Sequence, residues 1–469
     1  MKRTEGRVEE LKIAYIGGGS RGWARGLMSD LALEEKISGT VYLYDIDLEA
    51  AEDNAIIGNR MKFLPENKGD WTYIAVSDIE KALDGADFVV LSVLPGTFDE
   101  MQSDVHAPEE YGIYQSVGDT VGPGGVLRAM RTIPIYKGFA EKIKKYCPNA
   151  WVINYTNPMT ICTKTLYEVF PEIKAFGCCH EVFGTQEFIA NVYNEKTGSK
   201  TQRYDIDVNI FGINHFTWVN KAKYKCEDLM PLMLEYANTH KRGAASKSLN
   251  WMNKSFCANQ SIKLDLYRRY GVLAAAGDRH LAEFCPGSWY LNDEKTVEDW
   301  EFWITTVDWR KQNRKDLVQI TKDIVAGKKP LEIKPTGEEG VRQMCALLGL
   351  GSYVTNVNIP NQGQIPNLPL GAVVETNAYF SGDSVIPLFA GEIPENVNHL
   401  VIRHVYNQEE IVKCTLNGDY EGVFKAFVND PNVDIPLDKA RELFDKMIEN
   451  TKEYLPYYNE YKQTRNKNV

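Results

Sequence analysis

The sequence predicts an α/β protein with an N-terminal Rossmann-type, doubly wound parallel sheet and a second, mixed α/β domain. Two observations support the sheet: a glycine-rich turn after the first apolar run, and a regular alternation of short apolar runs with helical patterns up to about residue 200. At 469 residues the chain exceeds the roughly 250 to 300 residues at which a single core stops growing. We therefore expect one domain over residues 1–200 and another over residues 201–469.

The elements of the first domain follow from this alternation. Residues 11–16 form an apolar run of strand length, GGGSRG follows, and residues 24–33 repeat apolar side chains at helical spacing. Further strands are expected at residues 41–44, 71–76, 88–93, 151–154 and 173–177, and helices at residues 51–63, 79–83, 133–145 and 158–169. In such a sheet the crossovers are right-handed, and ligands bind at the carboxyl ends of the strands.

The rhythm changes beyond about residue 200. Residues 207–211 and 216–224 have strand patterns, whereas residues 300–327, 340–350 and 437–454 have helical ones. This mixture is the basis for the second domain.

Composition narrows the class of protein. The net charge of −11 comes from scattered acidic residues, which argues against nucleic acid as the main partner. No stretch approaches the roughly 18 apolar residues of a membrane span, and the first residues lack the apolar core of a signal peptide. Nine cysteines without framework spacing fit reduced thiols. We expect a cytoplasmic protein without a membrane partner.

The glycine-rich turn has the pattern of a dinucleotide site. IGGGSRG places glycines at G-x-G-x-x-G spacing between a strand and a helix, which allows a pyrophosphate to approach backbone N–H groups. Asp45 ends the second strand, where a carboxylate accepts from an adenosine ribose and repels a 2′-phosphate, so NAD is favoured over NADP. Asp47 could take this role, and a turn without a ligand is the alternative. The expected cofactor residues are Gly17, Gly18, Gly19, Ser20, Arg21, Gly22 and Asp45.

Two further motifs suggest a metal. GCCHE ends the strand at 173–177, and GINHF brings His215 near another strand end. A thiolate from Cys179 and an imidazole from His215 would suit Mn, Fe, Co, Ni or Zn, and two ligands are too few for a closed structural zinc site. Cys178 would point the other way, into the core, although a vicinal disulfide is an alternative. Asn157 precedes Pro158 in NYTNP, which also suits a helix N-cap.

Taken in order and spacing, these motifs resemble glycoside hydrolase family 4: IGGGSRG, Asp45, GPGG at residues 122–125, NYTNP, GCCHE and GINHF. The resemblance implies a fold like that of lactate and malate dehydrogenases, and a need for NAD, a divalent metal, typically manganese, and a reduced cysteine. It also implies that the second domain binds substrate and metal and forms a homodimer or homotetramer. The α-galacturonidase-like branch is most similar, through VGDTVGPGG, GCCHEVFGTQ and AAAGDRHLAEF.

The implied reaction is hydrolysis of terminal α-D-galacturonides in small oligosaccharides, by transient oxidation at C3, loss of the C2 proton and elimination. Asp278 matches the base of α-specific members, His180 would donate a proton to the leaving group, and Cys179 and His215 would hold the metal. Expected substrate contacts are Asn157, Asp119, Asn214, Arg131 and Arg279. Arg128 and His280 are further candidates for the uronate carboxylate, and Asp119, Asp265, Glu283 or a tyrosine for the base.

Other functions fit parts of this pattern. Within the family, an α-galactosidase or α-glucosidase is the runner-up. An NAD-dependent dehydrogenase with net hydride transfer would share the cofactor motif and would accumulate NADH. A non-catalytic NAD-binding sensor would keep the glycine turn but would need no cysteine and histidine at strand ends.

Overall fold

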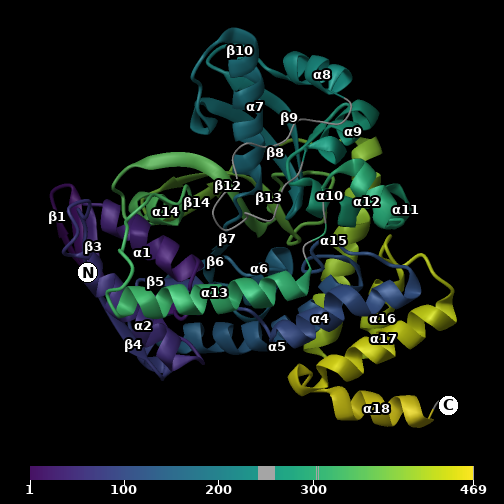
Figure 1. Cartoon of the computed structure of the whole chain (residues 1–469), viewed down its shortest axis with the longest axis horizontal. Coiled ribbons are helices and arrows are strands. Elements are labelled where there is room, and N and C mark those ends of the chain that lie inside the picture. Colours follow the sequence, from purple (N-terminus) through teal and green to yellow (C-terminus); the bar gives the residue numbers. More distant parts are fainter. Residues whose placement is uncertain (241–258, 303, 305, 468–469) are drawn as a thin grey trace.

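The computed structural model describes residues 1–240, 259–302, 304 and 306–467. Its main sheet has the strand order β14-β13-β12-β7-β6-β5-β2-β3-β4, with β1 paired to β2 (Figure 1). The six strands of the first part are all parallel: β2 (Arg7–Ile16), β3 (Ile37–Tyr44), β4 (Asp70–Val76), β5 (Phe88–Leu91), β6 (Trp151–Asn154) and β7 (Lys174–Gly177). The predicted Rossmann-type sheet is therefore confirmed.

Helices cover both faces of this sheet, which explains why its strands are apolar runs. In β5, Val90 packs in the layer that contains α1 and α2, whereas Val89 packs in the opposite layer with α5 and α6. The helices of this part are α1 (Trp23–Leu33), α2 (Leu48–Met61), α3 (Ile79–Leu83), α4 (Phe98–His106), α5 (Gly122–Tyr146), α6 (Met159–Val169) and α7 (Glu181–Thr197).

Helix α5 begins earlier than the prediction of residues 133–145, which was wrong about its start. GPGG forms the first turn of the helix, with Pro123 where no N–H donor is needed. A Cβ on Gly125 would lie 2.4 Å from the Thr120 carbonyl carbon, so the glycine lets the 117–121 loop fold back on the helix. This places Asp119 beside the amino end of α5.

The second part of the chain builds a smaller sheet and completes the main one. A hairpin joins β8 (Ile206–Ile213) to β9 (Phe216–Tyr224) through the two-residue turn Asn214–His215, and β10 (Glu227–Asp228) and β11 (Leu273–Ala274) pair with β9. Strands β12 (Ser352–Pro360), β13 (Val373–Ser381) and β14 (Ser384–Pro387), which were not predicted, extend the main sheet from β7. The division at residue 200 stays a prediction.

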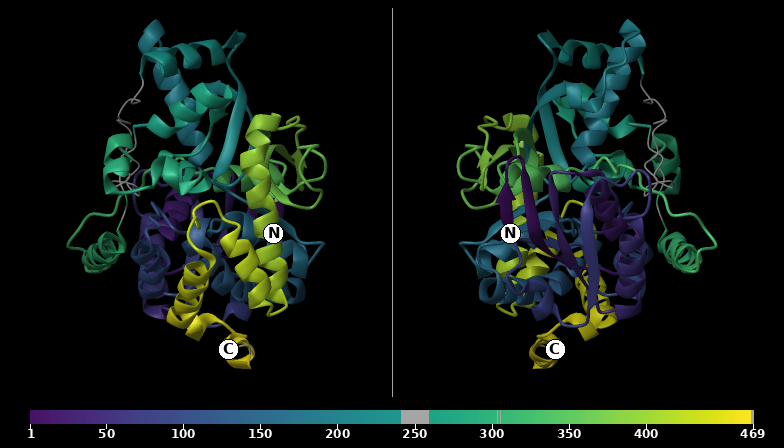
Figure 2. Two further views of the ribbon diagram at one scale, coloured as in Figure 1. Left: turned by 90° about the vertical axis from the view of Figure 1, so that its right-hand side faces the viewer. Right: turned by 90° about the vertical axis from the view of Figure 1, so that its left-hand side faces the viewer.

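The remaining helices surround these sheets (Figure 2). They are α8 (Met230–Thr239), α9 (Ser261–Tyr270), α10 (Asp278–Phe284), α11 (Gly287–Tyr290), α12 (Glu294–Trp300), α13 (Val307–Val325), α14 (Gly340–Leu347), α15 (Glu395–Leu416), α16 (Tyr420–Val428), α17 (Leu437–Thr451) and α18 (Tyr458–Lys467). The single helix expected at 300–327 was wrong, because α12 ends at Trp300 and α13 starts at Val307. Within the described ranges, no helix combines the length and the apolar character that crossing a membrane requires.

Candidate active site

The glycine-rich turn lies between β2 and α1 and packs tightly on the neighbouring strands. Gly17 has a φ of +97°, and a Cβ there would lie 1.9 Å from the Ser92 carbonyl oxygen. A Cβ on Gly18 would lie 2.7 Å from the Cα of Leu43. The N–H groups of both glycines donate to the carbonyl oxygen of Tyr44. Only glycine fits these two positions.

Asp45 has a structural task in this turn. Its Oδ2 accepts from the Gly19 N–H at 2.8 Å, and its Oδ1 accepts from the Asp47 N–H at 3.0 Å. Asp47 in turn caps α2 by accepting from Ala50. A carboxylate has about four lone-pair directions, so Asp45 can accept further hydrogen bonds from a ribose. The structure thus supplies a role for Asp45 that the motif did not reveal.

The entrance to α1 suits an anionic group. Its first turn contains no acidic residue, and the Nε of Arg21 is buried without a hydrogen-bond partner among the described residues. Ser20 Oγ accepts from the Trp23 N–H at 3.1 Å. Backbone N–H groups and an unpaired arginine nitrogen at a helix start fit a pyrophosphate. The expected NAD residues therefore lie together, and their role stays a prediction.

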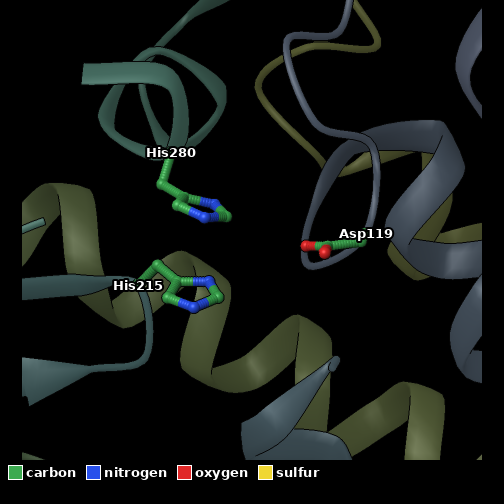
Figure 3. Close-up of side chains that lie close together, drawn as sticks. All are labelled: Asp119, His215 and His280. Carbon is green, nitrogen blue, oxygen red and sulfur yellow. The ribbon is translucent and has the colours of Figure 1, made fainter. Parts of the chain in front are cut away.

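A second cluster lies beyond the carboxyl ends of the strands. Asp119, His215 and His280 offer ligand atoms that all lie within 4.8 Å of one another (Figure 3). The two imidazole rings stack, with centroids 3.8 Å apart, and Asp119 faces them from the 117–121 loop. Two imidazoles and a carboxylate suit a divalent transition metal. The donor set of the chain therefore fits such an ion.

Thr120 fixes the protonation of His215. Its hydroxyl donates to Asp119 Oδ1 at 2.7 Å, so it must accept from His215 Nδ1, 3.1 Å away. The proton of the ring is then on Nδ1, and Nε2 keeps its lone pair. Burial, followed by the neighbouring His280, lowers the pKa of His215 to about 3, so the ring is neutral as a ligand requires.

Charge around Asp119 keeps it ionised. Burial alone would raise its pKa, but the nearby positive charge, that of Arg128 first, outweighs that effect and holds the pKa well below its usual range. Asn157 donates to Asp119 Oδ2 at 3.3 Å, and the Oδ1 of Asn157 has no hydrogen-bond partner among the described residues. Asn157 does not cap α6, whose N-cap is Pro158. Asn157 thus lies at the metal cluster with an open acceptor.

Cys179 is buried in the connection between β7 and α7. Burial, with the nearby carboxylates of Glu375 and Glu181, raises the pKa of its thiol, while the Asn214 side chain opposes that rise. Cys179 is outside the group formed by Asp119, His215 and His280. Its role as a ligand stays a prediction. The eight cysteines within the described residues are free, Cys178 and Cys179 included.

His180 is paired with Glu338. The Nδ1 of His180 lies 3.2 Å from Glu338 Oε1. Burial would lower the pKa of His180, but this hydrogen bond and the charge of Glu338 overcome it and raise the pKa to about 9. The imidazole therefore carries a proton at neutral pH. This state fits the predicted proton donor, and Glu338 itself had no signal in the sequence.

The proposed base and its alternatives have different surroundings. Asp278 is fully buried, its Oδ1 accepts from the Lys263 N–H at 3.1 Å, and burial raises its pKa. Glu283 Oε1 accepts from the N–H groups of Val117 and Gly118 at 2.7 and 2.8 Å, which anchors the loop that carries Asp119. Asp265 pairs with Arg269 and accepts from Tyr290. Of these groups, only Asp119 belongs to the metal cluster, and the base stays a prediction.

The arginines differ in what they already bind. Both terminal nitrogens of Arg131 donate to Asp104, at 3.0 and 2.5 Å, in a buried pair. Arg279 Nε donates to the Phe302 carbonyl oxygen at 3.0 Å. Arg128 Nε donates to the Asn157 carbonyl oxygen at 3.0 Å, but its buried Nη1 has no partner among the described residues. Arg128 is therefore best placed for an anionic substrate group.

Sequence reasoning missed several residues at the site. His280 was considered only for a substrate carboxylate, although its place in GDRHLAEF, two residues after Asp278, could have suggested a ligand. Glu181 follows GCCH directly, lies 3.9 Å from His280, and accepts from the Gly277 N–H. Glu375 lies on β13 and had no motif around it. Such residues become visible only when distant segments are brought together.

Comparison with known proteins gives the same family. Residues 12–195 match the model of family 4 glycosyl hydrolases, and residues 210–433 match the model of the family 4 C-terminal domain. The α-galacturonidase of Thermoanaerobacterium saccharolyticum is 57% identical, with 97% of this chain and 98% of the relative covered. The α-galacturonidase of Bacillus subtilis is 50% identical, with 94% of this chain and 98% of the relative covered. An α-galactosidase of Bacillus subtilis is 26% identical, with 95% of this chain and 99% of that relative covered.

Solved structures agree on the fold. The crystal structure of the lplD protein of Bacillus subtilis is 49% identical and matches with a TM-score of 0.89, covering 94% of this chain and all of that one. A 6-phospho-α-glucosidase from gut microorganisms, solved in complex with NAD and Mn²⁺, is 21% identical with a TM-score of 0.79, covering 95% and 99%. With matched models over most of its length and several relatives at half identity or more, the chain belongs to family 4 of the glycosyl hydrolases.

Proposed function

We propose that this enzyme is an α-galacturonidase that hydrolyses terminal α-D-galacturonides of small oligosaccharides. The observation that carries the proposal is the identity of 50% or more, over nearly the whole chain, to relatives with that name, against 26% to an α-galactosidase. The buried Nη1 of Arg128, which has no hydrogen-bond partner in the described part of the chain, supports it, because a uronate carboxylate needs a cation.

The two cofactor sites have distinct residues. The Gly17–Gly22 turn, Arg21 and Asp45 would hold NAD. Asp119, His215 and His280, with Cys179 from the neighbouring segment, would hold a divalent metal, which we propose is Mn²⁺. When bound, NAD would accept a hydride from C3 reversibly, and the divalent metal would act as a Lewis acid on the oxygen at that carbon. Such a scheme is an exception to glycosidases with two carboxylates.

The side chains of the chain handle binding and proton transfer. Asn157, next to Asp119, would offer its side-chain Oδ1, which no described residue hydrogen-bonds, to a sugar hydroxyl, and Arg128 would bind the C6 carboxylate. His180, protonated through Glu338, would give its proton to the departing glycosidic oxygen. Asp278 remains the proposed base at C2; Asp119 is the alternative that lies in the metal cluster.

The test is a panel of p-nitrophenyl α-glycosides, each assayed with NAD, Mn²⁺ and reductant omitted in turn. The galacturonide should be hydrolysed fastest, and each omission should lower the rate. No NADH should accumulate at steady state, since the hydride returns to C3. Faster hydrolysis of the galactoside or glucoside would favour the runner-up, and stoichiometric NADH would favour a dehydrogenase. The cytoplasmic location and the homodimer or homotetramer stay predictions.

A further inference from the structure

Glu375 is a buried carboxylate that has amides for partners. Only 1% of it is exposed on β13. Its Oε2 accepts from Asn214 Nδ2 at 3.0 Å, and its Oε1 accepts from Asn356 Nδ2 at 2.6 Å. Burial raises its pKa, and the hydrogen bonds from these asparagines oppose the rise. No lysine, arginine or histidine forms an ion pair with it in the part of the chain that the structure describes.

A carboxylate in such a place is costly unless its acceptor capacity is used. Transfer of a charge out of water is strongly unfavourable, and hydrogen bonds from neutral amides offset only part of that cost. A glutamine of the same shape would fill the same space without the charge. The presence of a glutamate at this position therefore has to be explained by hydrogen bonds that only a carboxylate can accept.

These contacts reach both segments that carry predicted metal ligands. Asn214 precedes His215 in the β8–β9 turn. Asn356 donates not only to Glu375 but also to the carbonyl oxygen of Cys179, at 3.0 Å. One carboxylate on β13 thus joins the turn that presents His215 to the connection that presents Cys179.

Only a carboxylate fixes the orientation of both amides. Asn214 and Asn356 both turn their Nδ2 groups toward Glu375, and each of its two carboxylate oxygens accepts one of these hydrogen bonds. The Oδ1 of Asn214 is then left buried without a hydrogen-bond partner among the described residues. A glutamine would present one donor, and one of the asparagines would have to rotate or lose its bond.

We propose that Glu375 is a positioning residue of the active site: it orients the Asn214 amide, leaving Oδ1 to accept from a sugar hydroxyl, and holds the His215 turn in place for the metal. Glu375 acts through Asn214 and does not touch the sugar or the metal. The inference rests on the proposed function for the metal and the sugar at this site.

The first experiment measures Mn²⁺ affinity without sugar, by electron paramagnetic resonance of free Mn²⁺ in the presence of NAD. Glu375→Gln should weaken Mn²⁺ binding by about tenfold or more, the range found for partners that orient ligands. Thr376→Val is the matched control, because Thr376 is the next residue of β13, is fully buried, and has a hydroxyl with no hydrogen-bond partner among the described residues. It should leave the affinity within about twofold.

The second experiment is a double-mutant cycle with Asn214→Ala. If Glu375 acts through Asn214, adding Glu375→Gln to Asn214→Ala should change the Mn²⁺ affinity by less than about threefold. If the double variant instead loses Mn²⁺ affinity by the product of the two single losses, the two residues act independently and the proposal is overturned. Unchanged Mn²⁺ affinity in Glu375→Gln would overturn it as well. Should Glu375→Gln fail to fold, Asn214→Ala alone decides: wild-type Mn²⁺ affinity in that variant overturns the proposal.

These readouts separate two failures. A wild-type enzyme that binds Mn²⁺ but hydrolyses no galacturonide contradicts the proposed substrate, while the comparison of variants still tests Glu375. A wild-type enzyme that binds no Mn²⁺ overturns the role of Glu375 directly. Where Mn²⁺ and substrate are both bound, Glu375→Gln should also raise KM for the sugar, because the acceptor on Asn214 is no longer fixed.

Discussion

Individual residues show how far a motif can be followed without a structure. Asp119, Asn157 and His215 stand in recognisable motifs, and the fold brings them into one cluster. Glu338 and Glu375 have no motif, and their importance depends on contacts with His180 and Asn214, more than 150 positions away along the chain. The sequence therefore predicts the members of this cluster better than the residues that support them.

Substitutions of Glu283 test whether it is a catalytic base or a residue that holds the loop carrying Asp119 in place. Burial raises its pKa to about 8, so it is mostly protonated at neutral pH, and its Oε1 accepts from two N–H groups of the 117–118 backbone. Glu283→Gln keeps that acceptor and should retain most activity, whereas Glu283→Ala should lower kcat by about tenfold or more as the Asp119 loop loosens. Steady-state kinetics on the galacturonide measures both. If Glu283→Gln is as inactive as the alanine variant, Glu283 has a chemical role.

Arg128 should decide between a uronate and a neutral sugar. Arg128→Lys keeps the charge but loses the fork-shaped donor pair, so kcat/KM for the α-galacturonide should fall by about tenfold or more. For the α-galactoside, which has no carboxylate, kcat/KM should change by less than about threefold. The ratio of the two constants is the readout. Equal losses on both substrates would assign Arg128 to holding Asn157 instead.

Whole elements were predicted where their apolar pattern was regular. Strand β6 and helix α3 begin and end at the predicted residues, and β9 does too. Strand β12 was missed because polar residues interrupt it at buried positions, Asn356 and Asn358, and both asparagines lie against the buried carboxylate of Glu375. The start of α5 was missed because glycines that allow close packing also look like breaks. The regular apolar pattern is thus interrupted where polar residues lie at the site and where glycines allow close packing.

The contact between α1 and the segment before α14 gives a prediction about pH. Asp30 Oδ1 on α1 accepts from the Thr336 N–H at 2.9 Å, and burial raises the pKa of Asp30 to about 6 in spite of this bond. The folded protein then holds a proton that the unfolded chain has lost above about pH 4, so this group makes the fold less stable as pH rises from about 4 to 6.

Asp30→Asn removes this titration and keeps an acceptor for Thr336. Relative to wild type, the variant should gain stability between about pH 4 and pH 7, by at most about 3 kcal/mol. Thermal unfolding of both proteins at about pH 4 and about pH 7 measures how the difference in Tm between the variant and wild type changes with pH. A difference in Tm that stays constant with pH would show that Asp30 has an ordinary pKa in the fold.

At the scale of the molecule, the parallel sheet was predictable and its completion was not. Strands β12–β14 come from far along the chain and pair antiparallel at the β7 edge. No local pattern states which edge a distant strand will join. The cluster of Asp119, His215 and His280 likewise combines a loop of the first part, a hairpin of the second and a short helix. The candidate metal cluster therefore forms only when segments from both parts of the chain come together.

Ligand binding to the assembled molecule should raise its thermal stability. A ligand at 100 times its Kd stabilises the folded state by about 2.7 kcal/mol, so Mn²⁺ and NAD should each raise Tm. His280→Ala should abolish most of the Mn²⁺ effect and keep the NAD effect, because His280 lies in the candidate metal cluster and outside the glycine-rich turn. Differential scanning fluorimetry with each ligand separately measures this. A normal Mn²⁺ shift in His280→Ala would favour a site built on Cys179 and His215.

The antiparallel pairing of β12 with β7 also matters while the protein is being made. A ribosome adds roughly 5 to 20 residues per second, so many seconds separate the emergence of residues 174–177 from that of residues 352–360. During that interval the nascent chain carries an apolar sheet whose last strand has an open edge, the kind of surface that recruits other chains. The β7 edge is therefore a surface that the C-terminal half of the chain can cover only late in synthesis.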